Sequence, residues 1–186
     1  MGKNKSKELL ELALASDFKN FGKDYPRVAI RQSNLAVVYK DKVIYAKGFG
    51  YRDVENKKPV TPNTLFAIGS STKAFTASLL GLLEKSGKLK LDDKATTHLP
   101  ALRFYNDEMN NQITIRDLMA HRTGLTRYDY SWYLFNTPNR DSIIARVKYM
   151  APTAGVRQKW YYNNFGYLAQ GMIVEKISGK TWEQNI

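Results

Sequence analysis

A serine and a lysine stand three residues apart in the segment AIGSSTKAF, residues 67–75. This spacing places Ser70 and Lys73 on one face of a helix, one turn apart. A hydroxyl beside an amine is a common way to build a nucleophile, because the amine can accept the hydroxyl proton. The same residues also fit a serine that only caps a helix and a lysine that extends to solvent. Both interpretations stay open on this segment alone.

The context of the pattern decides how much it means, since Ser16 and Lys19 show the same spacing. Ser70 follows a glycine and stands where an apolar helix is expected to begin, so the helix dipole would favour a developing alkoxide. Lys73 is the only charged residue within 59–83. Burial of a lone ammonium is costly and favours the neutral amine, which is the form that acts as a base.

A second candidate stretch, WYYNNFGY at residues 160–167, precedes another apolar helix. A tyrosine near an ammonium has its phenolate stabilised and can serve as a general base. An asparagine offers both a donor and an acceptor to a substrate amide. Tyr162 and Asn164 supply this pair. The alternative for this stretch alone is an aromatic cluster that only packs.

The elements that must position these residues follow from apolar periodicity, capping residues and turn residues. The sequence predicts a helix over 5–21, strands over 35–39 and 43–46, and a connecting loop over 52–64. Further helices are expected from Ser70 or Ser71 to Gly87, over 115–121 with Thr114 and Asp117 at its cap, over 141–150, over 167–177, and after Thr181 with Gln184 completing a capping box. The helix after Ser70 is expected to be buried on most sides, because its leucines are too numerous for a narrow stripe.

Composition limits the function classes. The 186 residues, 43% of them hydrophobic, suffice for one globular core. The chain has no cysteine and only two histidines, far apart in sequence, so no metal or other cofactor is expected. A net charge of +12 fits an anionic partner, but the basic residues are scattered, which favours a solvated basic surface. No targeting or transmembrane segment is visible.

Together the two stretches resemble the serine β-lactamase and penicillin-binding-protein superfamily. The branch they resemble contains class C β-lactamases, D-alanyl-D-alanine carboxypeptidases and related esterases. IGSSTKAFTA resembles its first motif, and YNNFGY resembles its Tyr-x-Asn motif with the following Gly-Tyr. Other segments match in order over 33–186: VIYAKGFGYRD, TPNTLFAIGS, LLEKSGKLKLDD, HLPAL, ITIRDLMAHRTGL and GYLAQGMIVEKISGKTWEQ.

The resemblance implies a role for four residues. Ser70 would be acylated by the substrate. Lys73 and Tyr162 would together remove the serine proton and return it to the leaving group, as a coupled pair. Asn164 would hold the acyl side chain of the substrate and steady Lys73.

The register of the second motif has an alternative, because Tyr161 and Asn163 also fit Tyr-x-Asn. The Gly-Tyr pair that follows the motif in the family stands at 166–167. This pair selects Tyr162, and we therefore expect Tyr162 rather than Tyr161 at the site.

The remaining candidates are expected to be structural. His121 stands at a helix end, where an imidazole is favourable near the last carbonyls. His98 precedes Leu99-Pro100 and is expected at the surface. The aromatic stretch YDYSWYLF, residues 128–135, could line a substrate entrance, but a division between core and rim is the favoured interpretation.

The sequence departs from the family pattern in two places. The third motif, Lys-Thr-Gly or His-x-Gly on a late strand, is missing, since Lys180-Thr181 is followed by Trp182. The family's Pro-Gly before the first strand is Pro26-Arg27 here. The late strand supplies one oxyanion-hole donor, and loss of one such donor costs ~100–1000-fold in rate. We therefore expect a fragment that is poorly active alone, with a sheet edge that self-associates or pairs with a missing C-terminal part.

The sequence thus predicts an α+β fold of the serine β-lactamase type, with 1–186 as a single incomplete domain that lacks the C-terminal strands. Its parts would be an N-terminal helix and connector (1–32), a hairpin and loop (33–66) and a helical region with both motifs (67–186). The resemblance implies a serine hydrolase that acts through an acyl-enzyme on D-amino-acid peptides, β-lactams or small esters. The alternative is a non-catalytic binding module or an inactive fragment.

The expected partner is a small-molecule or peptide substrate, and no nucleic acid is expected. The resemblance implies a periplasmic, secreted or cell-envelope location, near a membrane or cell wall. The sequence itself does not specify the compartment.

Overall fold

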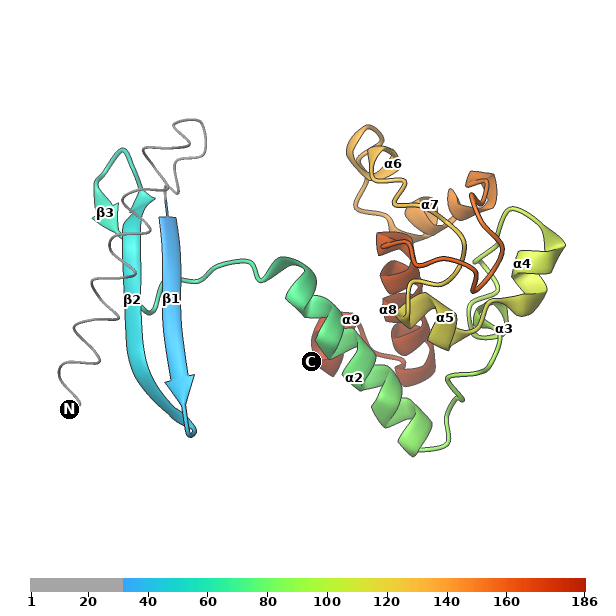
Figure 1. Cartoon of the computed structure of the whole chain (residues 1–186), viewed down its shortest axis with the longest axis horizontal. Coiled ribbons are helices and arrows are strands. Elements are labelled where there is room, and N and C mark those ends of the chain that lie inside the picture. Colours follow the sequence, from blue (N-terminus) through green and yellow to red (C-terminus); the bar gives the residue numbers. More distant parts are fainter. Residues whose placement is uncertain (1–31) are drawn as a thin grey trace. The chain divides into compact units, whose positions relative to one another are not determined.

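The computed structural model describes residues 32–186 (Figure 1). The helix expected over 5–21, the Ser16–Lys19 pair and Pro26-Arg27 lie outside the described residues. The chain forms two compact units, and the boundary between them falls between Ala67 and Ile68. The described part of the first unit is a small antiparallel sheet, and the second unit is helical, which confirms the α+β class.

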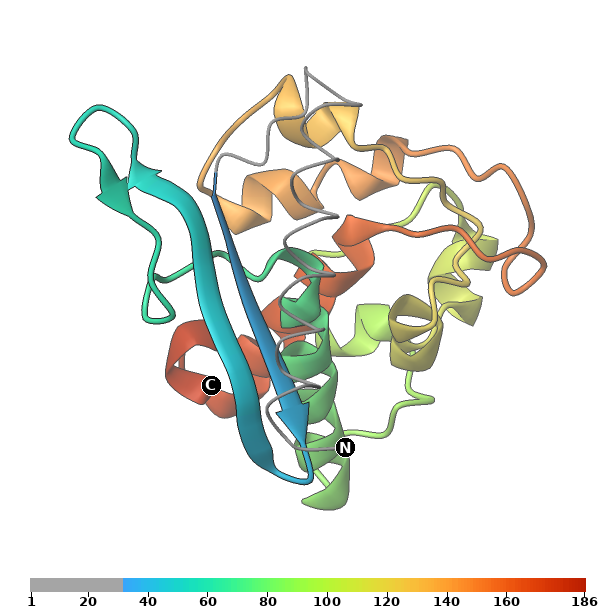
Figure 2. The same cartoon turned by 60° about the vertical axis from the view of Figure 1, so that its left-hand side comes forward.

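The sheet is built on a long hairpin, which is seen from two sides in Figures 1 and 2. Strand β1 (Gln32–Tyr39) pairs antiparallel with strand β2 (Lys42–Asp53). The turn residues Lys40 and Asp41 have φ angles of 47° and 60°. Two successive left-handed residues form the turn whose twist matches that of paired strands, so the predicted hairpin is confirmed.

A third strand corrects the prediction that residues 52–64 form only a loop. Strand β3 (Lys58–Pro59) pairs with β2, so the hairpin is not alone. Proline is tolerated because this short strand lies at the sheet edge, where its missing N–H breaks no interior ladder. Gly48 lies inside β2, and a Cβ there would meet Val60 O at 2.3 Å. The glycine allows the chain after β3 to approach the strand closely.

Helix α2 (Thr72–Lys85) follows a short 3₁₀ turn, η1 (Gly69–Ser71). Ser71 stands at the N-cap position of α2, one of the two positions expected, but its hydroxyl makes no capping bond, and Ser70 lies within the 3₁₀ turn. The expected burial is wrong, because Thr76 and Leu80 are the buried residues of α2. The physical reason is that α2 packs on α8, while its opposite side, which includes Phe75 and Leu82, remains exposed in the described chain.

Helix α8 (Asn164–Ser178) runs through the middle of the helical unit, with α2 on one side and α5 on the other (Figure 1). It begins three residues before the predicted start, because the side chain of Asn163 accepts from Gly166 N and caps it (3.0 Å). It ends at Gly179, whose φ is 70°. Its buried residues form the centre of the core: Phe165, Gly166, Ala169, Gln170, Met172, Ile173 and Val174.

Helix α5 (Ile115–Met119) carries the predicted capping box. Thr114 accepts from Asp117 N (3.2 Å), and the Asp117 carboxylate accepts from Thr114 N (3.0 Å). The helix ends before the predicted residue 121, because His121 adopts a left-handed φ of 57°. This early end turns the backbone toward the segment that carries Tyr162.

Short helices complete the unit: α3 (Ala95–His98), α4 (Asp107–Gln112), α6 (Tyr130–Tyr133), α7 (Arg140–Ile144), η2 (Val147–Tyr149) and α9 (Trp182–Asn185). The helix expected over 141–150 is therefore divided in two, and α3, α4 and α6 are further helices that the sequence did not predict. The capping box of α9 is confirmed. His98 is not a free surface residue, since its Nε2 lies 2.8 Å from the Asp93 carboxylate.

The described residues contain neither a membrane-spanning helix nor a metal-binding cluster. No helix within 32–186 has the length and apolar character needed to cross a membrane. No cluster of three or more His, Cys, Asp or Glu in this part of the chain has a metal-binding arrangement.

Candidate active site

The hydroxyl of Ser70 receives two hydrogen bonds from different elements. Lys73 Nζ, one turn along α2, donates to Ser70 Oγ over 3.1 Å. Tyr162 OH, from the segment before α8, donates to the same oxygen over 2.5 Å. Two donors at one oxygen stabilise the negative charge that develops when a serine loses its proton.

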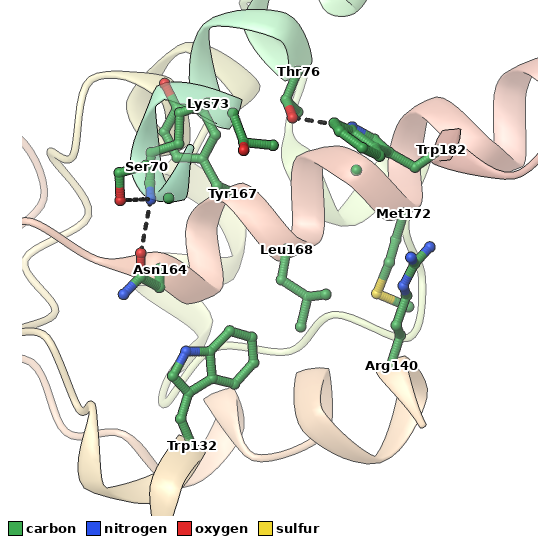
Figure 3. Close-up of a pocket in the computed structure, with 13 residues that line it drawn as sticks. Ser70, Lys73, Thr76, Trp132, Arg140, Asn164, Tyr167, Leu168, Met172 and Trp182 are labelled. Atoms are coloured by element: carbon green, nitrogen blue, oxygen red, sulfur yellow. Dashed lines mark hydrogen bonds between the residues drawn. The ribbon is translucent and has the colours of Figure 1, made fainter. Parts of the chain in front are cut away.

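Asn164 closes the site from the first turn of α8 (Figure 3). Its Oδ1 accepts from Lys73 Nζ over 2.8 Å, so the ammonium is held between the serine and the amide. The structure therefore brings together all four residues that the sequence singled out. The alternative pair is placed elsewhere: Asn163 caps α8 and donates to Thr126 O (2.6 Å), while Tyr161 N donates to His121 O.

Two cations lie against the ring of Tyr162. Lys73 Nζ is 4.8 Å from the ring centroid, and the guanidinium carbon of Arg127 is 5.0 Å from it. Hydrogen bonds with Lys73 and Ser70 lower the pKa of Tyr162, and the charges of Lys73 and Arg127 add to the effect, against a smaller opposing effect of burial. A lower pKa makes the phenolate available nearer to neutral pH, which suits a general base.

His121 packs against Tyr162, a contact that the sequence did not predict. Its ring lies 4.6 Å from that of Tyr162, and its Nδ1 accepts from Asn163 N over 3.2 Å. Its carbonyl accepts from Tyr161 N over 3.0 Å, so His121 holds both neighbours of Tyr162. Burial and the charge of Lys73 lower the pKa of His121, which keeps the imidazole neutral and its Nδ1 free to accept. This is consistent with the structural role expected for it.

Tyr167 is a second aromatic residue at the site that the sequence used only to set the motif register. Its ring lies 5.4 Å from Lys73 Nζ, and its hydroxyl donates to Met119 O over 3.2 Å. Burial raises the pKa of Tyr167, with a contribution from Tyr162, so Tyr167 stays protonated where Tyr162 ionises more easily. The two tyrosines therefore differ: Tyr162 is placed to exchange a proton with Ser70, whereas Tyr167 packs.

A pocket of about 410 Å³ opens beside Ser70 and extends between α2 and α8 (Figure 3). Its far end is formed by Trp182, whose Nε1 donates to Thr76 Oγ1 over 3.0 Å. Trp132 lines the pocket and packs on Phe165, with ring centroids 4.9 Å apart. The aromatic stretch is thus divided as expected, since Tyr130 remains 79% exposed.

The structure thus places a serine, a lysine one turn along its helix and a tyrosine from a second segment together, which is the arrangement that the resemblance implied. A family model described as "Beta-lactamase" matches residues 16–186, and the chain belongs to this family. This confirms the predicted superfamily and fold over the part that the chain covers.

Named relatives share this fold and part of the sequence. The teichoic acid D-alanine hydrolase of Staphylococcus aureus is 29% identical over 185 residues, which are 99% of this chain and 45% of that protein. The octameric penicillin-binding protein homologue of Pyrococcus abyssi has a TM-score of 0.75 at 27% identity, over 91% of this chain and 40% of its own. The D-amino acid amidase of Ochrobactrum anthropi has a TM-score of 0.71 at 25% identity, over 92% and 47%.

The chain therefore spans less than half the length of these relatives. Two of the three carry a hydrolase or amidase name, and a class C β-lactamase is also similar, with a TM-score of 0.68 at 26% identity over 91% of this chain and 47% of its own. These likenesses support a serine hydrolase family for the chain.

Proposed function

We propose that this chain carries the acylating residues of a serine hydrolase that works through an acyl-enzyme on D-amino-acid peptides, β-lactams or small esters. One observation carries the proposal: Ser70 Oγ is contacted by both Lys73 Nζ and Tyr162 OH, at the mouth of a pocket large enough for a small substrate. The relatives named as a D-alanine hydrolase and a D-amino acid amidase support the D-amino-acid class of substrate.

The geometry suits a two-step acyl transfer. Ser70 Oγ attacks the substrate carbonyl carbon and forms an ester bond, while its proton passes to the Lys73–Tyr162 pair. The bond to the leaving group breaks, and the pair returns the proton to the departing nitrogen or oxygen. Water then attacks the ester, releases the acid and restores the serine hydroxyl. The proton belongs to the pair rather than to one residue, because the two groups interact strongly.

Covalent labelling tests this function directly. The chain is incubated for hours with a fluorescent penicillin and, separately, with an activated ester, then digested and analysed by mass spectrometry. We expect one acyl group on the peptide that contains Ser70. Reversible binding of either probe without any covalent adduct would contradict the proposal and favour the non-catalytic binding module.

Removal of one group from the proton-transferring pair should slow acylation while the fold survives. Tyr162→Phe removes only a hydroxyl, and Lys73→Met removes mainly a charge. Each substitution is expected to reduce the rate constant for labelling by ~100-fold or more. The double variant should be much less impaired than the product of the two effects, because residues that act as a unit are not additive.

The rate constants are obtained from labelling reactions that are stopped at successive times, and circular dichroism checks the fold of each variant. Independent, fully multiplicative effects of the two substitutions would contradict a shared proton. Loss of folding in Tyr162→Phe would show that the hydroxyl is structural.

A further inference from the structure

Two oppositely charged side chains next to the site, Arg127 and Asp129, come from one segment, residues 127–129. Arg127 Nε donates to Asp129 Oδ2 over 2.6 Å. Tyr128 between them has a left-handed φ of 50°, and its hydroxyl donates to Ala151 O over 2.6 Å. The segment is therefore anchored to a distant part of the chain, and the pair is held in place. The acyl-transfer steps described above do not use these two residues.

Asp129 contacts the amide of Asn164. Asn164 Nδ2 faces Asp129 Oδ1 at 3.4 Å, while Asn164 Oδ1 accepts from Lys73 Nζ at 2.8 Å. An amide that was turned over would place its NH₂ against the ammonium and its oxygen against the carboxylate. Both contacts would then be repulsive, so the carboxylate and the ammonium select the same orientation. The side chain of Asp129 is 22% exposed, which limits the competition from water.

Arg127 contacts the other partner of the serine. Its guanidinium carbon lies 5.0 Å from the centroid of the Tyr162 ring, on which Lys73 Nζ also lies at 4.8 Å. Among residues 32–186, the further groups that interact with this ring are His121, which is neutral, Trp160, with its ring centroid at 6.3 Å, and Tyr167, which stays protonated. The charges that act on the phenol are therefore those of Lys73 and Arg127, and both lower the pKa of Tyr162. Asp129 acts on the phenol through Arg127, whose charge it partly neutralises.

We propose that Arg127 and Asp129 form a positioning pair for this site. Asp129 holds the Asn164 amide in the orientation that Lys73 requires, and Arg127 supplies a second positive charge to the ring of Tyr162. The inference rests on the proposed acyl transfer for its purpose. The charge effect on Tyr162 is a property of the folded chain and can be measured without any substrate.

The two members of the pair should shift the ionisation of Tyr162 in opposite directions. Arg127→Gln removes a cation from the surroundings of the phenolate, so Tyr162 should ionise at a higher pH than in the unaltered chain. Arg127→Lys keeps the charge and should restore most of the difference. Asp129→Asn removes the neutralising carboxylate, so Tyr162 should ionise at a lower pH than in the unaltered chain.

The ionisation is measured by NMR on chain labelled with ¹³C at the ζ carbon of tyrosine. The chain has 12 tyrosines, and the Tyr162 signal is identified by its loss in Tyr162→Phe. Arg122→Gln is the matched control, because Arg122 is an exposed arginine five positions earlier. The pH profile of Ser70 labelling is recorded on the same variants. The acid limb of this profile should move to higher pH in Arg127→Gln and stay at the same pH in Arg122→Gln. The Asp129→Asn chain should be labelled about tenfold more slowly at its optimum pH.

The outcomes separate this inference from the proposed function. If Tyr162 ionises at the same pH in the unaltered chain, Arg127→Gln and Arg122→Gln, the positioning pair is overturned, whatever the labelling result. If Tyr162 shifts in the stated directions but no acyl group ever attaches to Ser70, the charge effect of the pair is upheld and the proposed function fails. A drop in labelling without any shift of the acid limb in Arg127→Gln would indicate a merely structural role and would also overturn the inference.

Discussion

The Ser70→Ala chain is expected to form no ester adduct with an activated acyl probe, whereas the unaltered chain gains the mass of one acyl group. Alanine has no oxygen with which to form the bond, and Lys73 and Tyr162 are then left without a nucleophile to deprotonate. Intact-protein mass spectrometry measures the loss. Neutral hydroxylamine distinguishes the chemistry, because it cleaves an ester on serine but leaves an amide on the neighbouring lysine.

Ser71→Ala is the matched control for this substitution. Ser71 is adjacent, exposed and free of side-chain capping bonds in the described structure, so its replacement should leave labelling unchanged. An ester adduct that persists in Ser70→Ala at the original rate would refute the assignment of the nucleophile. Loss of labelling in Ser71→Ala alone would do the same.

Asp117→Ala is expected to lower the free energy of unfolding by about 3 kcal/mol, because it leaves a charged hydrogen-bond network without its acceptor. Asp117 is buried, and its carboxylate accepts from Arg157 Nη2 at 2.7 Å and from Thr114 at the cap of α5. Arg157 in turn donates its backbone N–H to Arg122 O, which fixes the segment that leads to Tyr162. Urea unfolding followed by circular dichroism measures the change.

Asp92→Ala is the matched control, since Asp92 also forms an ion pair with an arginine, Arg116, at 2.7 Å. Both of these side chains are more than half exposed, so the substitution should change stability little. Equal destabilisation by the two substitutions would contradict the importance of burial.

The same carboxylate makes stability depend on pH. Burial favours the neutral acid, but hydrogen bonds from Arg157 and Thr114 and the charge of Arg157 outweigh it and leave the pKa of Asp117 below its ordinary value. A depressed acid pKa adds stability above the unfolded-state pKa of about 3.9, and this stability is lost as pH falls through the lower folded-state value. The Asp117→Ala chain should therefore lose less stability than the unaltered chain on acidification below about pH 4.

The site was predictable because its residues stand at fixed positions in two short motifs. Ser70 and Lys73 are one helical turn apart, so their contact needs only local structure. Tyr162 and Asn164 come from a distant segment, and the resemblance to a family placed them where geometry alone could not. Arg127 and His121 had no such signal, because their positions depend on left-handed residues at 121 and 128, and sequence periodicity does not reveal these.

The errors in the fold have a common physical origin. Apolar content predicted that α2 would be buried on most sides, but composition does not say which neighbours are present to cover a helix. Phe75 and Leu82 are 48% and 61% exposed. Similarly, the prolines within 52–64 favour a loop by propensity. Propensity does not show that a two-residue edge strand needs few ladder hydrogen bonds and can therefore contain Pro59. Capping boxes at Thr114 and Thr181 were predicted correctly, since they depend on residues three positions apart.

The hydrogen bond from Tyr162 to Ser70 joins residues 92 positions apart, and the one from Lys73 to Asn164 spans 91. Closure of loops this long has an entropic cost that one hydrogen bond does not offset, so these contacts depend on the packing of α2 against α8. A chain still emerging from the ribosome, or unfolded by urea, therefore carries only an ordinary alcohol at Ser70. The time at which this serine becomes reactive toward an acyl probe would then report when the native helix packing forms during refolding.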